Sequence, residues 1–167
     1  MPTALKLRYY GDPVLRKTAR PVKSVGSVER LIIKEMIKAM YDFDGLGLAA
    51  NQVGMDEQIF VADDGDGPFA VMNPEILWTS PQKTPLEEGC LSFPGIRITV
   101  HRPEMVRVRY LDETGRSVER ELTKTLAKVF QHESDHLFGR MIIDHATAED
   151  REKFKVQLAK LEALSKR

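Results

Sequence analysis

One short motif constrains this chain more than any other feature. Residues 132–136 read His-Glu-Ser-Asp-His, an H-E-x-x-H motif in a segment of helical apolar spacing that runs from about Thr123 towards Gly139. At ~100° per residue, His136 lies about 40° around the helix from His132 and one turn along, so both imidazoles can reach one metal ion. Glu133 is offset from this pair, where it suits a general base acting on a water at the metal. The motif therefore predicts a helix that faces a metal site.

A catalytic metal site usually has three protein ligands, so the rest of the chain must supply one more. The metzincin pattern would place a third histidine at position 142, but that residue is Ile142. The remaining candidates are a downstream helical carboxylate, as in thermolysin-like sites, or another soft or imidazole ligand: Glu149, Glu152, His145, His101 and Cys90. Cys90 is favoured by its surroundings, because Gly89 lets the backbone approach closely and Pro94-Gly95 forces a turn just after it.

A third segment, 45–52, reads Gly-Leu-Gly-Leu-Ala-Ala-Asn-Gln. Its small residues permit tight backbone packing or the close approach of a ligand, and Gln52 offers an amide donor. Taken alone, the segment is better explained as a plain turn followed by a buried strand.

Composition excludes several classes of protein. The single cysteine among 167 residues cannot form an internal disulfide, which argues against a secreted disulfide scaffold. Equal numbers of basic and acidic residues, 25 of each, argue against nonspecific binding to nucleic acid or to an anionic membrane. No apolar run approaches the ~18–20 residues of a membrane span. We therefore expect one soluble, cytoplasmic domain over residues 1–167.

The order of expected elements indicates an α+β fold. We predict a helix over 28–43, ended by Asp44-Gly45, and a final helix over 147–165 with Thr147 as its N-cap. Strands are expected at 58–62, 69–72, 76–78, 97–100, 105–110 and 118–122, with a hairpin turn at 113–116. The prediction is a set of antiparallel strands packed around a central metal-binding H-E-x-x-H helix, with an N-terminal and a C-terminal helix.

The three segments together resemble the signature motifs of peptide deformylases, G-x-G-x-A-A-x-Q, E-G-C-L-S and H-E-x-D-H, in the right order and at typical separations. The resemblance extends to Asp12-Pro13-Val14-Leu15-Arg16 and covers essentially the whole chain. One departure is Lys124-Thr125, which stand where family members often have Gly-Leu.

The resemblance implies a role for each motif residue. Cys90, His132 and His136 would hold the metal, and Glu133 would be the general acid and base. Gln52 and the backbone N–H of Leu91 would stabilise the oxyanion. Similar proteins also pair the motif glutamate, here Glu88, with an arginine on a following strand, here Arg102.

The resemblance further implies the reaction: hydrolysis of the N-formyl group of formyl-methionine on newly synthesised peptides, with release of formate. The peptide would lie extended beside Gly45 and Gly47 and beside the 87–89 segment, which includes Glu88 and Gly89. Val129 lies one turn before His132 on the metal-facing arc and suits an apolar side-chain pocket.

The metal and the partners follow from the same resemblance. Thiolate and imidazole ligands suit several ions, and the family favours Fe²⁺ as the native ion, with Zn²⁺, Ni²⁺ or Co²⁺ as substitutes. The partner would be a nascent formyl-methionyl peptide, with the ribosome as one place of encounter, and neither nucleic acid nor a membrane is expected as a specific partner.

Two rival functions remain open at this level. One is a small metallopeptidase that uses Glu149 or Glu152 as its third ligand. The other is a metal-stabilised peptide-binding protein without turnover, although the retained Glu133 argues against it, because a purely structural site has no use for a general base.

Overall fold

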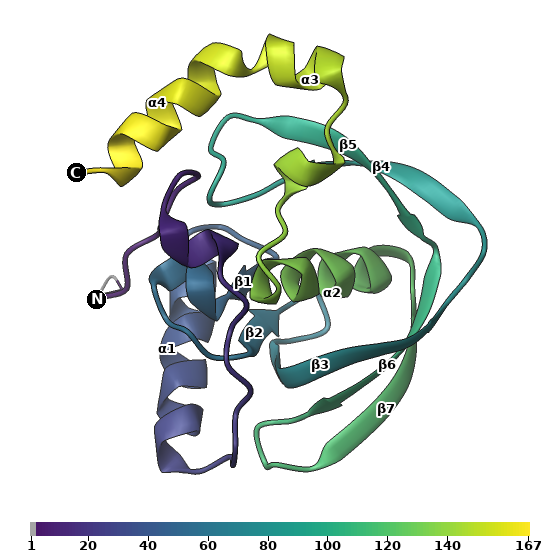
Figure 1. Cartoon of the computed structure of the whole chain (residues 1–167). Coiled ribbons are helices and arrows are strands. Elements are labelled where there is room, and N and C mark those ends of the chain that lie inside the picture. The colour runs from purple at the N-terminus through teal and green to yellow at the C-terminus, as the bar shows by residue number, and fades with distance from the viewer. Residues whose placement is uncertain (1–2) are drawn as a thin grey trace.

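The computed structural model of the chain describes residues 3–167 and consists of two antiparallel sheets and four α-helices (Figure 1). The helices are α1 (Ser27–Asp42), α2 (Lys124–Leu137), α3 (Ala148–Lys153) and α4 (Lys155–Ser165). The strands are β1 (Gly47–Ala49), β2 (Ile59–Ala62), β3 (Phe69–Thr79), β4 (Lys83–Gly89), β5 (Arg97–Pro103), β6 (Met105–Leu111) and β7 (Ser117–Thr123). Three short 3₁₀ turns are η1 (Pro13–Arg16), η2 (Ala50–Val53) and η3 (Ile142–His145).

The larger sheet has five strands in the order β1-β2-β3-β6-β7, and β4 and β5 form a separate two-stranded sheet. Every neighbouring pair is antiparallel. The turn between β6 and β7 lies where the sequence predicts it, because Asp112 Oδ1 accepts hydrogen bonds from the backbone N–H groups of Thr114 (2.9 Å) and Arg116 (3.1 Å). The predicted mixture of antiparallel sheets and helices is therefore confirmed.

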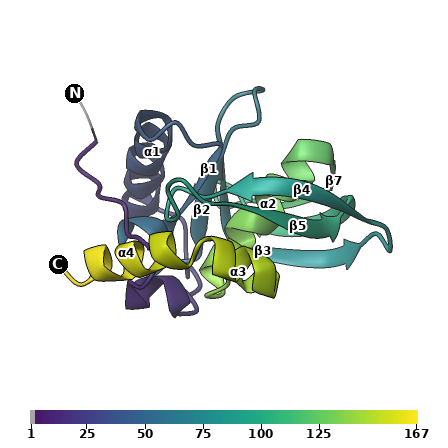
Figure 2. The same ribbon diagram turned by 90° about the horizontal axis from the view of Figure 1, so that it is seen from above.

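Helix α2 occupies the centre of the molecule, between the β4–β5 hairpin and the larger sheet (Figures 1 and 2). Its apolar side packs on the sheet through Ala127, Phe130 and Leu137, and Phe130 meets Phe60 of β2 edge to face with ring centroids 5.1 Å apart. At ~100° per residue, Lys128, His132 and Asp135 lie on the opposite side of the helix, which faces the hairpin. Helix α2 therefore packs on the sheet with its apolar side and faces the hairpin with charged and polar side chains.

Two further apolar clusters complete the core. Helix α1 covers β1 and β2 through buried residues that include Met36 and Met40. The hairpin packs through Ile98 and Val100 of β5 against η3 and the α4 residue Leu161. No helix within residues 3–167 is long and apolar enough to cross a membrane.

The structure corrects several expected boundaries. Strand β3 is continuous where Asn73-Pro74 predicted a break, because the register shifts there and Asn73 adopts φ +53°. The Asn73 side chain also bonds the backbone N–H and C=O of Val22 (2.7 and 2.8 Å). Asp44, rather than Gly45, takes the left-handed conformation after α1 (φ +56°). The predicted C-terminal helix is interrupted at Phe154, whose buried ring separates α3 from α4.

Strand β4 is absent from the expected elements. Pro85 removes a backbone donor and three charged residues precede Cys90 within β4, a composition that is unfavourable for a central strand. The strand is tolerated because β4 pairs on one side only, with β5, over the seven residue pairs from Lys83↔Pro103 to Gly89↔Arg97.

The end of α2 generates a stability prediction. Gly139 lies at φ +77°, and a Cβ built there would be 2.5 Å from the carbonyl oxygen of Arg16. We expect Gly139→Ala to lower the free energy of unfolding by more than about 2 kcal/mol in urea titrations, through left-handed strain and the steric clash. The control is Gly115→Ala, because φ is +85° there but the nearest contact is an ordinary 3.6 Å. Equal losses in both variants would contradict a role for the Arg16 contact.

Candidate metal centre and active site

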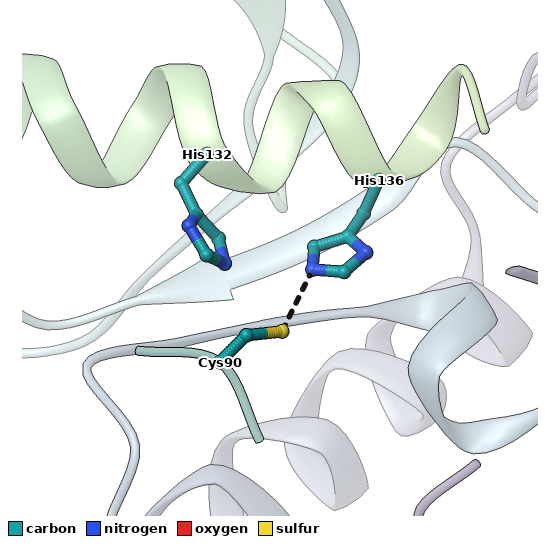
Figure 3. A group of neighbouring side chains, drawn as sticks. All are labelled: Cys90, His132 and His136. Carbon is teal, nitrogen blue, oxygen red and sulfur yellow. Dashed lines mark hydrogen bonds between the residues drawn. The ribbon is translucent and has the colours of Figure 1, made fainter. Parts of the chain in front are cut away.

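The structure brings two histidines and the cysteine together from separate elements. His132 and His136 project from α2, and Cys90 follows the last residue of β4 (Figure 3). One potential ligand atom from each of the three lies within 4.8 Å of the others, and Cys90 Sγ is 3.2 Å from His136 Nε2. Within residues 3–167 this is the one group of three or more such side chains with spacing suited to a metal ion.

The other ligand candidates lie elsewhere. Glu149 and Glu152 are exposed on the short helix α3. His145 lies 3.1 Å from Asp135 through its Nε2 atom, and His101 is exposed on β5. The geometry therefore favours the thiol over a downstream carboxylate or a third imidazole.

The donor set fits a transition-metal ion. A thiolate with two neutral imidazoles is a common ligand combination for such ions. His132 Nδ1 lies 2.9 Å from Glu88 Oε1, so its N–H donates to that carboxylate and Nε2 is left as the ligand atom. Glu133 Oε2 is buried without a hydrogen-bond partner within the described residues, which leaves an acceptor beside the ligand group. Cys90, His132 and His136 therefore suit a metal ion, and Glu133 beside them can accept a hydrogen bond from one further polar group.

Glu133 is the residue on α2 with the most unusual environment. Its side chain is buried against the backbone of β1, since a Cβ on Gly47 would lie 2.7 Å from Glu133 Oε1. Glycine at position 47 is therefore required for this close approach. Burial raises the pKa of Glu133 to about 7, despite the opposing effect of His132. A carboxyl group with such a pKa is suited to both accept and return a proton near neutral pH.

A buried ionic network holds the candidate ligand His132 on the side away from Cys90. Glu88 accepts two hydrogen bonds from the Arg102 guanidinium (2.7 and 3.0 Å), and Arg102 also donates to Asp135 (2.9 Å). Burial alone would raise the pKa of Glu88, but the bonds from His132 and Arg102 outweigh it and lower the pKa to about 2. The same balance lowers the pKa of Asp135 to about 2, with His145 and Arg102 as its partners. Both carboxyl groups are therefore fixed as anions.

An open cavity of about 540 Å³ lies in front of the ligand group. It is lined by all the residues that the sequence associates with the substrate or with catalysis: Gly45, Gly47, Gln52, Glu88, Gly89, Leu91, Val129 and Glu133. Gln52 is held at its base, where Oε1 accepts from the Ala49 N–H (2.9 Å) and Nε2 lies 3.4 Å from Cys90 Sγ. The cavity thus combines a ligand group, a buried carboxyl and amide donors.

Sequence reasoning missed several supporting residues. The hydroxyl of Ser92 accepts a bond from Gln52 Nε2 (3.2 Å), and its place in the E-G-C-L-S segment is a signal that could have found it. Lys128 is buried beside His132, although a lysine on a helix usually indicates a solvated face.

Lys124, at the departure noted above, adopts φ +54°, which explains physically why a glycine suits that position.

Comparisons with known proteins agree with this geometry. A sequence model of the family described as polypeptide deformylase matches residues 4–152. The peptide deformylase of Thermotoga neapolitana is 52% identical over 139 residues, which cover 83% of this chain and 85% of that protein.

Solved structures give the same result. The crystal structure of peptide deformylase from Thermotoga maritima superposes with a TM-score of 0.84 at 48% identity, covering 86% of this chain and 97% of that one. A peptide deformylase from Synechococcus elongatus in complex with actinonin gives a TM-score of 0.87 at 38% identity, over 92% of this chain and 88% of that one. On sequence and structure alike, this chain belongs to the peptide deformylase family.

Proposed function

We propose that the chain hydrolyses the formyl amide at the N-terminus of formyl-methionyl peptides, releasing formate, with Glu133 as the general base and acid. The single observation that carries the proposal is the convergence of Cys90, His132 and His136 within 4.8 Å, next to the buried Glu133 in one open cavity. Family membership supports the reaction, and the cavity supports the assignment of roles.

Cys90, His132 and His136 would hold one divalent ion, which we propose to be Fe²⁺ in the native protein, with Zn²⁺, Ni²⁺ or Co²⁺ as substitutes. A bound ion supplies Lewis-acid polarisation of the formyl oxygen and lowers the pKa of a water molecule. The Glu88 carboxylate would hold the His132 ring in the tautomer that presents Nε2 to the ion.

The proton transfers would run through Glu133. Its carboxylate takes a proton from the attacking water as the water oxygen bonds to the formyl carbon. Negative charge then develops on the formyl oxygen, towards which the Gln52 amide and the Leu91 N–H would donate, each contributing on the order of 2.7–4 kcal/mol. Glu133 returns the proton to the amine nitrogen as the carbon–nitrogen bond breaks, which gives formate and a free N-terminus.

The cavity also suggests how the peptide is held. Glu88 and Gly89 line it from β4, and Gly47 at the start of β1 and Gly45 just before it line it from the other side, where an extended peptide would add as a strand. Val129 and Thr125 line it from α2, one and two turns before His132, and would contact the methionine side chain.

We further propose that residues 1–167 form one domain and that the substrate is a nascent peptide met in the cytoplasm, at or near the ribosome. The name of the bacterial relatives, peptide deformylase, supports a peptide as the substrate. No specific nucleic-acid or membrane partner is proposed, in keeping with the balanced charge of the chain.

The ligand assignment predicts that Cys90→Ala loses tight metal binding, because removing one of three ligands leaves an incomplete site. Metal content after gel filtration, measured by elemental analysis, checks this. Glu149→Gln and Glu152→Gln are the matched controls and should retain one metal per chain. Full occupancy in Cys90→Ala, or metal loss in either control, would support the metallopeptidase alternative.

The assignment of iron predicts oxygen sensitivity. Iron beside a thiolate exposed to an open cavity is vulnerable to oxidation of the metal or of Cys90. Protein loaded anaerobically with Fe²⁺ should therefore deformylate a formyl-methionyl dipeptide faster than the zinc form, and should lose activity in air. If the iron form is no more active than the zinc form and survives air unchanged, the iron proposal is wrong.

The role of Glu133 predicts that Glu133→Gln binds metal normally but is nearly inactive. Loss of a general acid–base group typically costs ~10²–10⁴-fold, and because Glu133 would serve both transfers, kcat should fall by the upper end of that range. Amine release from the formyl dipeptide and metal content are measured together, with Glu149→Gln as the control. Retention of more than about a tenth of kcat, or loss of the metal, contradicts the mechanism.

A further inference from the structure

Lys128 is a buried lysine for which the proposed chemistry has no use. Its side chain lies on α2 one turn before His132 and is almost fully removed from solvent. The ammonium donates three hydrogen bonds: to Thr84 O (2.9 Å), Thr84 Oγ1 (2.8 Å) and Arg102 O (2.9 Å). An ammonium has three donors, so all of them are used on the hairpin.

The two acceptor residues are not independent. Thr84 of β4 and Arg102 of β5 are direct partners in the β4–β5 register. Lys128 therefore binds one rung of the hairpin from both strands at once. That rung carries the Arg102 side chain, which bonds Glu88 through two nitrogens.

At one end the hairpin continues from β3 and into β6, where backbone hydrogen bonds join Ser80 to Met105 and Gln82 to Glu104. It forms a separate two-stranded sheet, and β4 pairs with β5 alone. Its polar attachments to α2 come from Lys128, from His132, which bonds Glu88, from Asp135, which bonds Arg102, and from Gln131, whose Nε2 donates to Pro103 O (3.1 Å). These four residues lie within about 100° of arc on one side of α2, at ~100° per residue.

We propose that Lys128 is a positioning residue that fixes the Thr84–Arg102 rung to α2 and so holds Glu88 against His132 and Cys90 at the metal site. The inference rests on the proposed metal site. A loosened rung would let the end of β4 move, and both the Glu88–His132 bond and the Cys90 thiol depend on where β4 ends.

The variant Lys128→Met tests this, because methionine keeps the length of the side chain and removes the ammonium. We expect hydrogen exchange of the β4 amides in metal-free protein to accelerate about tenfold, the effect of losing a charge-assisted hydrogen-bond donor. Release of bound metal to a chelator should also accelerate about tenfold. The control is Lys83→Met, which removes an exposed lysine from β4 itself and should alter neither rate.

Two further measurements separate positioning from simple packing. Combined with Glu88→Gln, Lys128→Met should add almost nothing to the rate of metal release, because both act through the same carboxylate. Fully additive effects, or a change confined to KM with unchanged metal release, would overturn the proposal and leave Lys128 with no role beyond lining the cavity.

Thr84→Val keeps the inference testable if Lys128→Met does not fold. It removes one of the three acceptors and should accelerate β4 exchange and metal release in the same direction, by less; no change in either would overturn the proposal. The exchange measurement needs neither metal nor turnover. A wild-type chain that fails to bind metal or to deformylate would therefore contradict the proposed function without deciding the role of Lys128.

Discussion

The buried pair of Glu88 and Arg102 is the interaction on which the rest of the site depends. Both side chains are almost fully buried, and two hydrogen bonds of 2.7 and 3.0 Å join them. Removal of one member would leave an uncompensated buried charge, a cost of about 3–5 kcal/mol in other proteins. Glu88 also accepts a hydrogen bond from the His132 N–H. One carboxylate therefore links the hairpin to the helix that carries the histidines.

This arrangement explains why a small chain needs two sheets. The five-stranded sheet gives α2 an apolar support through Phe130 and Leu137, which fixes the height and rotation of the helix. The β4–β5 hairpin approaches the opposite side with charged and polar groups, which fix the direction of individual side chains. The cavity lies at the edge between these two supports and is open to solvent.

Features of the fold that depend on neighbouring residues could be predicted from the sequence, and features that depend on distant contacts could not. The H-E-x-x-H helix, the β6–β7 turn and the antiparallel strands follow from local periodicity and turn chemistry, which act over a few residues. Strand β4 could not be predicted, because its Pro85 is acceptable only at a strand that pairs on one side. The continuity of β3 depends on Val22, a residue 51 positions away that bonds Asn73.

The sequence by itself determined that two imidazoles and one carboxylate share a helix, since a spacing of three or four residues fixes neighbours on any α-helix. It favoured Cys90 over His101, His145, Glu149 and Glu152 as the third candidate ligand, through the residues around it and a family resemblance, but it could not show which of them lies near α2. Only the tertiary structure decided which of them lies within reach, and that decision came from the hairpin, whose position is set by buried charge pairs. Such pairs join residues that are far apart in the chain, such as Arg102 and Asp135, and they leave no local pattern in the sequence.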